Sequence, residues 1–185
     1  MELLNKPPSP FQATFDYLNN EFSTSKEKEL KIDENIAAPT FTVDCPEKVV
    51  LASYPRSGNT LIRSYLERIT GIITGSDHNT ELKLNKELFE LGMTGEGHID
   101  SGVWIVKTHY PERLGHSPMK VNRCILMVRS PIDSLWSFFN MMAMQSHNKA
   151  IPEDRVKDLS EIWDMFIKDE IKTWNEFHEY WTKAP

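Results

Sequence analysis

Residues 54–60, YPRSGNT, combine a positive charge with closely spaced hydrogen-bond donors. Arg56 carries a fixed charge and a fork of five N–H donors. Gly58 lets the backbone bend, and it lies among residues of types that cap helices, Ser57, Asn59 and Thr60. Backbone N–H groups at the start of a helix favour an anion, so the segment predicts a phosphate-binding loop. It is not a Walker A sequence, because no lysine follows Gly58 and no glycine precedes it at the required distance.

A second polar cluster follows the apolar run VWIV at residues 103–106. Lys107, Thr108 and His109 come directly after that run. A histidine can accept a proton near neutral pH, so His109 is a candidate general base. A single histidine after a strand is more often structural than catalytic, and the spacing alone leaves both interpretations open.

A third cluster begins at Arg129, after the apolar run RCILMV at residues 123–128. Pro131 suits the first turn of a helix, and Asp133 suits the positive end of the helix dipole. Ser137 lies eight residues after Arg129. Taken alone, these residues fit a surface charge and an ordinary helix residue equally well.

The segments between these clusters predict the elements that position them. Short apolar runs predict buried parallel strands at residues 48–53, 103–106 and 123–128. Apolar spacing predicts helices after the first loop, with one apolar face made by Leu61, Ile62, Tyr65, Leu66 and Ile69, and over residues 80–91, 131–146 and 155–182. We therefore expect an α/β fold with three α/β/α layers around a central parallel sheet, similar to P-loop NTPases. The carboxyl ends of such strands share one edge, where ligands bind.

Length and composition suit one globular domain, here 48–185, preceded by an extension or linker at 1–47. The extension includes a candidate short amphipathic helix between Phe11 and Phe22. A net charge of −6 argues against a general nucleic-acid binder. An anionic ligand would need local positive charge, for which the candidates are Arg56, Arg63, Lys107 and Arg129.

Two cysteines, Cys45 and Cys124, form no metal-binding pattern or disulfide framework. Cys124 lies in an apolar run and is expected to be a buried thiol. The glycine-rich stretch 92–102 predicts a loop that could line a pocket, and neither His78 nor His98 is assigned a catalytic or metal-binding role. The chain has no apolar run long enough to span a membrane and no signal peptide, which favours a cytoplasmic location. It carries no signal for an oligomeric state.

The three polar clusters, in this order, resemble the motifs of sulfotransferases that use 3′-phosphoadenosine 5′-phosphosulfate (PAPS). The family patterns are close to YPKSGTTW, KTHLP and RNPKDxxxS. This chain carries Arg56 in place of the lysine, Tyr110 in place of the leucine, and Ser130 and Ile132 in the third motif. The similarity extends over 48–183 and includes a late W…H…YW pattern at Trp174, His178, Tyr180 and Trp181. The phrase TGIITGSD is most similar to the WSC-domain-containing sulfotransferase-like branch.

The resemblance implies transfer of a sulfuryl group from PAPS to a hydroxyl or amine of a small-molecule or carbohydrate acceptor. It implies that His109 is the general base, that Lys107 supports the transferred group, and that Arg56 neutralises charge on the leaving phosphate. It places the 5′-phosphate on the loop residues Ser57, Gly58, Asn59 and Thr60, together with Arg56. It places the 3′-phosphate on Arg129 and Ser137. This chemistry requires no metal.

Two features of the family are missing from these 185 residues: a YEDL-like strand after the last helix, and a basic segment close to RKGxxGDW that closes over the nucleotide. The resemblance therefore implies a domain without its C-terminal part. An alternative is a non-catalytic module that binds PAPS or its product 3′-phosphoadenosine 5′-phosphate (PAP). A third interpretation, a phosphoryl-transfer enzyme, is disfavoured by the absent Walker lysine.

Overall fold

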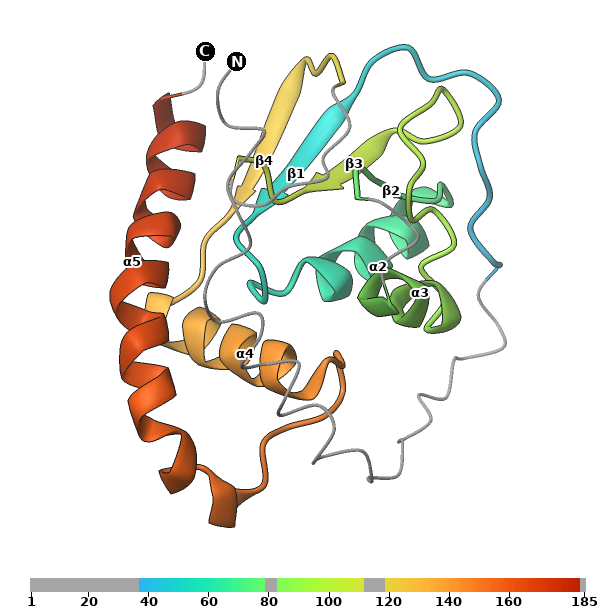
Figure 1. The fold of residues 1–185 in the computed structure, drawn as a ribbon. Helices are drawn as coiled ribbons and strands as arrows, with labels where there is room; N and C mark the ends of the chain where they lie inside the picture. The colour runs from blue at the N-terminus through green and yellow to red at the C-terminus, as the bar shows by residue number, and fades with distance from the viewer. Residues whose placement is uncertain (1–36, 79–82, 112–118, 184–185) are drawn as a thin grey trace.

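The computed structural model describes residues 37–78, 83–111 and 119–183 (Figure 1). The parallel sheet has the strand order β2-β3-β1-β4, with β1 Val49–Ser53, β2 Gly75–Ser76, β3 Ile105–Thr108 and β4 Arg123–Met127. The helices are α2 Asn59–Thr70, α3 Lys83–Glu90, α4 Pro131–Met144 and α5 Ser160–Lys183, with 3₁₀ turns at Glu153–Arg155 and Lys157–Leu159. The predicted α/β fold with a parallel sheet is confirmed. The candidate helix near Phe11 lies outside the described residues.

Strand β1 lies between β3 and β4 and runs parallel to both. The chain segments that follow these three strands therefore start at one edge of the sheet. Leu51 of β1 is in register with Lys107 of β3 on one side and with Ile125 of β4 on the other. From β1 the chain passes through α2 to β2 and β3, and β4 is then added on the opposite side of β1. The carboxyl end of β1 is therefore a topological switch point, the usual place for a ligand in an open α/β sheet.

Helices cover both faces of the sheet. On one face, α2 packs through Ile62 and Leu66 on an apolar cluster that includes Val49, Leu51 and Ile105. On the other face, α4 and α5 form the main core with residues of β1 and β4. Aromatic rings fill this core, among them Phe138, Phe139, Trp163, Phe166 and Phe177. Figure 1 shows α5 running alongside the β4 edge.

The buried side of α2 differs from the predicted apolar face. Only two of the predicted residues pack on the sheet, and the others are exposed: Leu61, Tyr65 and Ile69. The helix instead buries polar side chains at i, i+4 and i+8, namely Asn59, Arg63 and Glu67. Polar groups tolerate burial when they have partners, and the structure supplies partners for each of them. Periodicity identified the helix correctly but not the direction in which it faces.

Two further expectations are corrected by the structure. The second strand begins at Ile105 rather than 103 and continues through Lys107 and Thr108, which are therefore strand residues. Cys124 is exposed rather than buried, because β4 is an edge strand of the sheet. The Cys124 thiol is nevertheless partly covered, and this partial burial raises its pKa.

Part of the predicted N-terminal extension packs on the domain. Thr40 forms a parallel bridge with Ile72, and its amide donates to the carbonyl of Gly71 at 3.0 Å. Thr42 and Cys45 donate to the carbonyls of Gly102 and Ser101. In the described part of the chain, no helix combines the length and the apolar character that crossing a membrane requires.

Candidate functional site

The loop after β1 has the tight backbone expected of an anion-binding turn. Gly58 adopts a left-handed conformation with φ 97°, which favours glycine, and it caps the N-terminus of α2. Arg56 is also left-handed, with φ 63°, an uncommon conformation for a residue with a side chain. The Ser57 hydroxyl is buried, and it has no hydrogen-bond partner in the described part of the structure. An unpaired hydroxyl beside the start of a helix fits a ligand that brings its own acceptor.

The guanidinium of Arg56 extends to α4 and to the segment that follows α4. Its Nε donates to the Ser137 hydroxyl at 3.0 Å. Its Nη1 lies 3.0 Å from Nδ1 of His147, and its Nη2 donates to the His147 carbonyl at 3.2 Å. The first predicted motif is thus in direct contact with a residue of the third.

Arg129 completes this positive group. Its Nη1 donates to the backbone carbonyl of Arg56 at 2.8 Å, and its side chain is exposed. Burial lowers the pKa of Arg56, and the nearby charge of Arg129 lowers it further. The charge of Glu87 offsets part of this repulsion, and a bound anion would offset more of it. The structure therefore brings together three of the predicted phosphate-binding residues, Arg56, Arg129 and Ser137.

His109 lies at the end of β3 and is buried at 9% exposure. Its Nδ1 donates to the backbone carbonyl of Ser53, with 2.5 Å between the two atoms. This contact places the proton on Nδ1 and makes Nε2 the basic nitrogen. The side-chain amide of Asn59 lies 3.5 Å from Nε2 and donates to the Ser53 hydroxyl at 3.0 Å.

The two remaining predicted residues are Thr60 of the loop and Lys107 of β3. Thr60 donates to the side-chain carbonyl of Asn59 at 3.3 Å, so the Asn59 side chain is directed to His109 and Thr60 rather than out of the loop. Lys107 is 3% exposed on the α2 side of the sheet, and its charge lowers the pKa of both Glu96 and His147. The predicted residues thus form two contact groups, one around Arg56 and one around His109, which the loop of residues 56–60 connects along the chain.

His78 is a neighbour of the candidate base that sequence reasoning left without a role. Its ring meets the ring of His109 edge to face, with 5.0 Å between centroids. Its Nδ1 lies 3.1 Å from a carboxylate oxygen of Asp77, and Thr108 donates to the other oxygen at 2.5 Å. The position of Asp77 and His78 directly after a two-residue strand gives no periodic signal, so the sequence did not reveal this contact.

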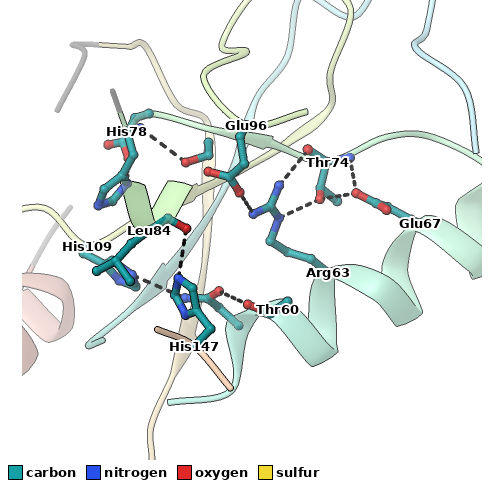
Figure 2. A network of polar contacts seen from close by, with 12 residues as sticks. Thr60, Arg63, Glu67, Thr74, His78, Leu84, Glu96, His109 and His147 are labelled. Carbon is teal, nitrogen blue, oxygen red and sulfur yellow. Dashed lines mark hydrogen bonds and ion pairs between the residues drawn. The ribbon is translucent and has the colours of Figure 1, made fainter. Parts of the chain in front are cut away.

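Arg63 does not contribute to the positive group, and the expectation that it supplies charge for an anionic ligand is wrong. Its side chain is fully buried and forms an ion pair with Glu96 (Figure 2). Its Nε and Nη2 donate to the hydroxyl and carbonyl of Thr74 at 2.8 and 3.0 Å. Burial pushes the pKa of Glu96 up, but the charges of Arg63 and Lys107 and the hydrogen bonds from Arg63 and Ser76 together outweigh burial, so the pKa is lowered. The pair fastens α2 to the glycine-rich loop.

Comparison with known proteins finds relatives of the same family name. The chain is similar to WSCD family members from Drosophila pseudoobscura pseudoobscura (31% identical over 138 residues), Drosophila melanogaster (30% over 138) and Aedes aegypti (30% over 137). The matches cover 74–75% of this chain and 41–42% of the relatives, so the chain spans about two fifths of their length. No protein-family model matches the chain, and no solved structure matches it.

Proposed function

We propose that this domain binds PAPS and transfers its sulfuryl group to an acceptor hydroxyl or amine. One observation carries the proposal: the loop after β1, the end of β3 and the start of α4 place Arg56, Arg129 and a histidine with a basic Nε2 at the switch point of the sheet. A nucleotide with phosphates at both ends needs two cationic contacts, and the proposal assigns one to each arginine. The P-loop-like character of the nucleotide site belongs to the same proposal.

The residues of the loop fit such a ligand. The unpaired Ser57 hydroxyl and the backbone N–H groups at the start of α2 are donors suited to the 5′-phosphate. Arg129 and Ser137 are the contacts for the 3′-phosphate. Arg56 contacts Ser137 through Nε and accepts from Arg129 through its carbonyl, and it joins the two ends of the site.

PAPS would supply the activated sulfuryl group. In the transfer, the acceptor oxygen or nitrogen forms the new bond to sulfur, and the sulfur–oxygen bond to the 5′-phosphate breaks. Nε2 of His109 takes the acceptor proton. Arg56 and Lys107 stabilise negative charge on the leaving phosphate and on the sulfuryl oxygens. Arg56 keeps its proton at working pH, so its role is electrostatic.

Calorimetric titration with PAP tests the nucleotide site first. We expect the wild-type chain to bind and both Arg56→Ala and Arg129→Ala to weaken binding by tenfold or more, because a hydrogen bond to a charged group contributes roughly 1.5–3 kcal/mol. Arg68→Ala is the matched control, since it removes one charge from the exposed last turn of α2. Failure of a folded wild-type chain to bind PAP would refute the proposal, and equal loss in Arg68→Ala would reduce it to a general charge effect.

The non-catalytic module that binds PAPS or PAP is the second candidate, because the side-chain amide of Asn59 lies 3.5 Å from Nε2 of His109, the nitrogen that a general base needs. A transfer assay with labelled PAPS and a panel of hydroxyl and amine acceptors separates the two. Binding of PAP that Arg129→Ala abolishes, with no transfer to any acceptor, would favour the module. Transfer that depends on His109 would favour the enzyme.

A further inference from the structure

The residue that holds the Arg56 side chain lies outside all three predicted motifs. His147 follows α4 after a left-handed Gln145, with φ 45°. It contacts Arg56 twice, through Nδ1 at 3.0 Å from Nη1 and through its carbonyl at 3.2 Å from Nη2. These contacts engage both terminal nitrogens of the guanidinium, and Ser137 engages Nε.

The tautomer of His147 follows from its second ring nitrogen. Nε2 lies 3.2 Å from the backbone carbonyl of Leu84 on α3, and a carbonyl can only accept (Figure 2). Nε2 therefore carries the proton, and Nδ1 presents a lone pair to Nη1 of Arg56. A neutral imidazole in this tautomer is complementary to a guanidinium, whereas an imidazolium would place two donors and two charges face to face.

Helix α3 fixes the backbone of the same segment. The Glu87 carboxylate accepts from the Ser146 hydroxyl at 2.7 Å and from the His147 amide at 2.8 Å. His147 is thus held by α3 at two points, its backbone amide and Nε2 of its ring. This support matters because Arg56 has a left-handed backbone, and such conformations persist when their surroundings over-determine them.

We propose that His147 is a positioning residue that holds Arg56 in its place in the phosphate loop through the lone pair of a neutral Nδ1. The effect of His147 on nucleotide affinity rests on the proposed function. The contacts between His147 and Arg56 do not depend on a nucleotide. Three charged groups face His147: Arg56 from the loop, Glu87 from α3 and Lys107 from β3. Burial, then the charge of Arg56, lowers the pKa of His147 to about 4, so the imidazole is neutral at physiological pH.

Two conservative variants separate the roles of the two ring nitrogens. Asparagine can place its carbonyl oxygen close to the position of Nδ1, so His147→Asn keeps the acceptor for Arg56 and loses the contact with Leu84. Glutamine can place its amide close to the position of Nε2, so His147→Gln keeps the donor to Leu84 and loses the acceptor for Arg56. If His147 only fastened its segment to α3, His147→Gln would behave like the wild type and His147→Asn would not.

The direct measurement is the guanidinium NMR spectrum of Arg56, assigned by comparison with Arg56→Lys. A guanidinium held at both terminal nitrogens rotates slowly and gives separate Nη signals, and a released one gives averaged signals. We expect separate signals in the wild type and His147→Asn and averaged signals in His147→Gln. Averaged signals in the wild type, or separate signals in His147→Gln, would overturn the proposal.

PAP titration of the same proteins gives the functional readout. We expect His147→Gln to raise the dissociation constant roughly tenfold or more, the size of one hydrogen bond to a charged group, and His147→Asn to stay within a few-fold of the wild type. If the wild type shows separate Arg56 signals but no PAP binding, the positioning role stands and the proposed function fails. Equal affinities for PAP in all three proteins, with binding present, would overturn the positioning role.

Acidification provides a further check, made on the wild type and His147→Asn side by side. Below about pH 4 the imidazole gains a proton, loses its lone pair and repels Arg56. We expect the separate Nη signals of the wild type to average in this range and those of His147→Asn to persist. Because Glu87 and Lys107 are present in both proteins, the difference between them reports on His147. The same pH response in both proteins would contradict the proposal.

Discussion

His109 donates through Nδ1 to the carbonyl of Ser53, which makes Nε2 the nitrogen that would take the acceptor proton. We expect His109→Ala to lower the transfer rate by roughly two orders of magnitude, the usual size of a general-base effect, with PAP affinity nearly unchanged. His98→Ala is the control, because that side chain is 45% exposed and contacts Asp100 within the glycine-rich loop. Steady-state kinetics with one acceptor decides the matter, and equal rates in wild type and His109→Ala would remove this residue from the mechanism.

At the scale of single residues, the sequence indicated which groups could do chemistry but not which groups touch. The motif spacing marked Arg56, Arg129 and Ser137, and the structure places them in contact. Arg63 has the same charge, yet it is buried against Glu96, because a contact 33 residues away decides its environment. His147 carried no signal either, since its role depends on the fold of a turn and on a carbonyl of α3.

At the scale of elements, apolar runs and periodicity located the helices and strands, and their limits were accurate where local signals were strong. Helix α4 begins at the predicted Pro131, with the Ser130 hydroxyl accepting from the amide of Asp133 at 3.4 Å. The strand before His109 begins and ends later than its apolar run implied, because its pairing with β1 starts at Ile105 and continues through Thr108. The buried polar side of α2 was not predictable, since no single-helix pattern shows where partners for polar groups will lie.

The buried ion pair of α2 gives a prediction at this scale. Arg63→Met leaves Glu96 buried without its counter-charge, and removing one partner of such a pair costs roughly 3–5 kcal/mol. The double variant Arg63→Met/Glu96→Gln removes both charges and is expected to recover much of that loss. Urea unfolding measures the free energy of each protein.

Arg68→Met is the matched control for this pair, because Arg68 is exposed on the same helix and an exposed substitution changes stability by roughly 0.5 kcal/mol or less. If Arg63→Met and Arg68→Met had the same unfolding free energy, the pair would have no part in fastening α2 to the loop that contains Glu96. If the double variant were less stable than Arg63→Met alone, replacing Glu96 would itself lower the stability, and an unpaired Glu96 charge would not explain the loss.

At the scale of the whole molecule, the order of the strands creates the site. The loop after β1 can meet both the end of β3 and the start of α4 only because β1 lies between β3 and β4. The sequence predicts parallel strands but not their order, which depends on contacts between distant segments. The same arrangement brings α5 to the loop, where the Tyr54 hydroxyl donates to Glu170 and the Tyr54 ring packs on Phe177.

The titration of His147 extends to the stability of the whole fold. Its folded pKa of about 4 lies below the ordinary value of 6.5, so between these values the unfolded chain binds more protons than the folded one. The free energy of unfolding therefore falls as the pH drops from about 6.5 to about 4, by at most roughly 3 kcal/mol for the full shift. The pKa of Glu96 is also lowered, so its contribution is lost at still lower pH.

Urea unfolding of wild type and His147→Asn at several pH values between 7 and 4 isolates the histidine. We expect the wild-type free energy of unfolding to fall through this window and that of His147→Asn to fall less, because asparagine does not titrate. The two proteins share Glu96, Glu87 and every other carboxyl group, so the difference between their curves belongs to His147. Parallel curves would mean that His147 has an ordinary pKa in the folded protein, and the neutral imidazole beside Arg56 would lose its support.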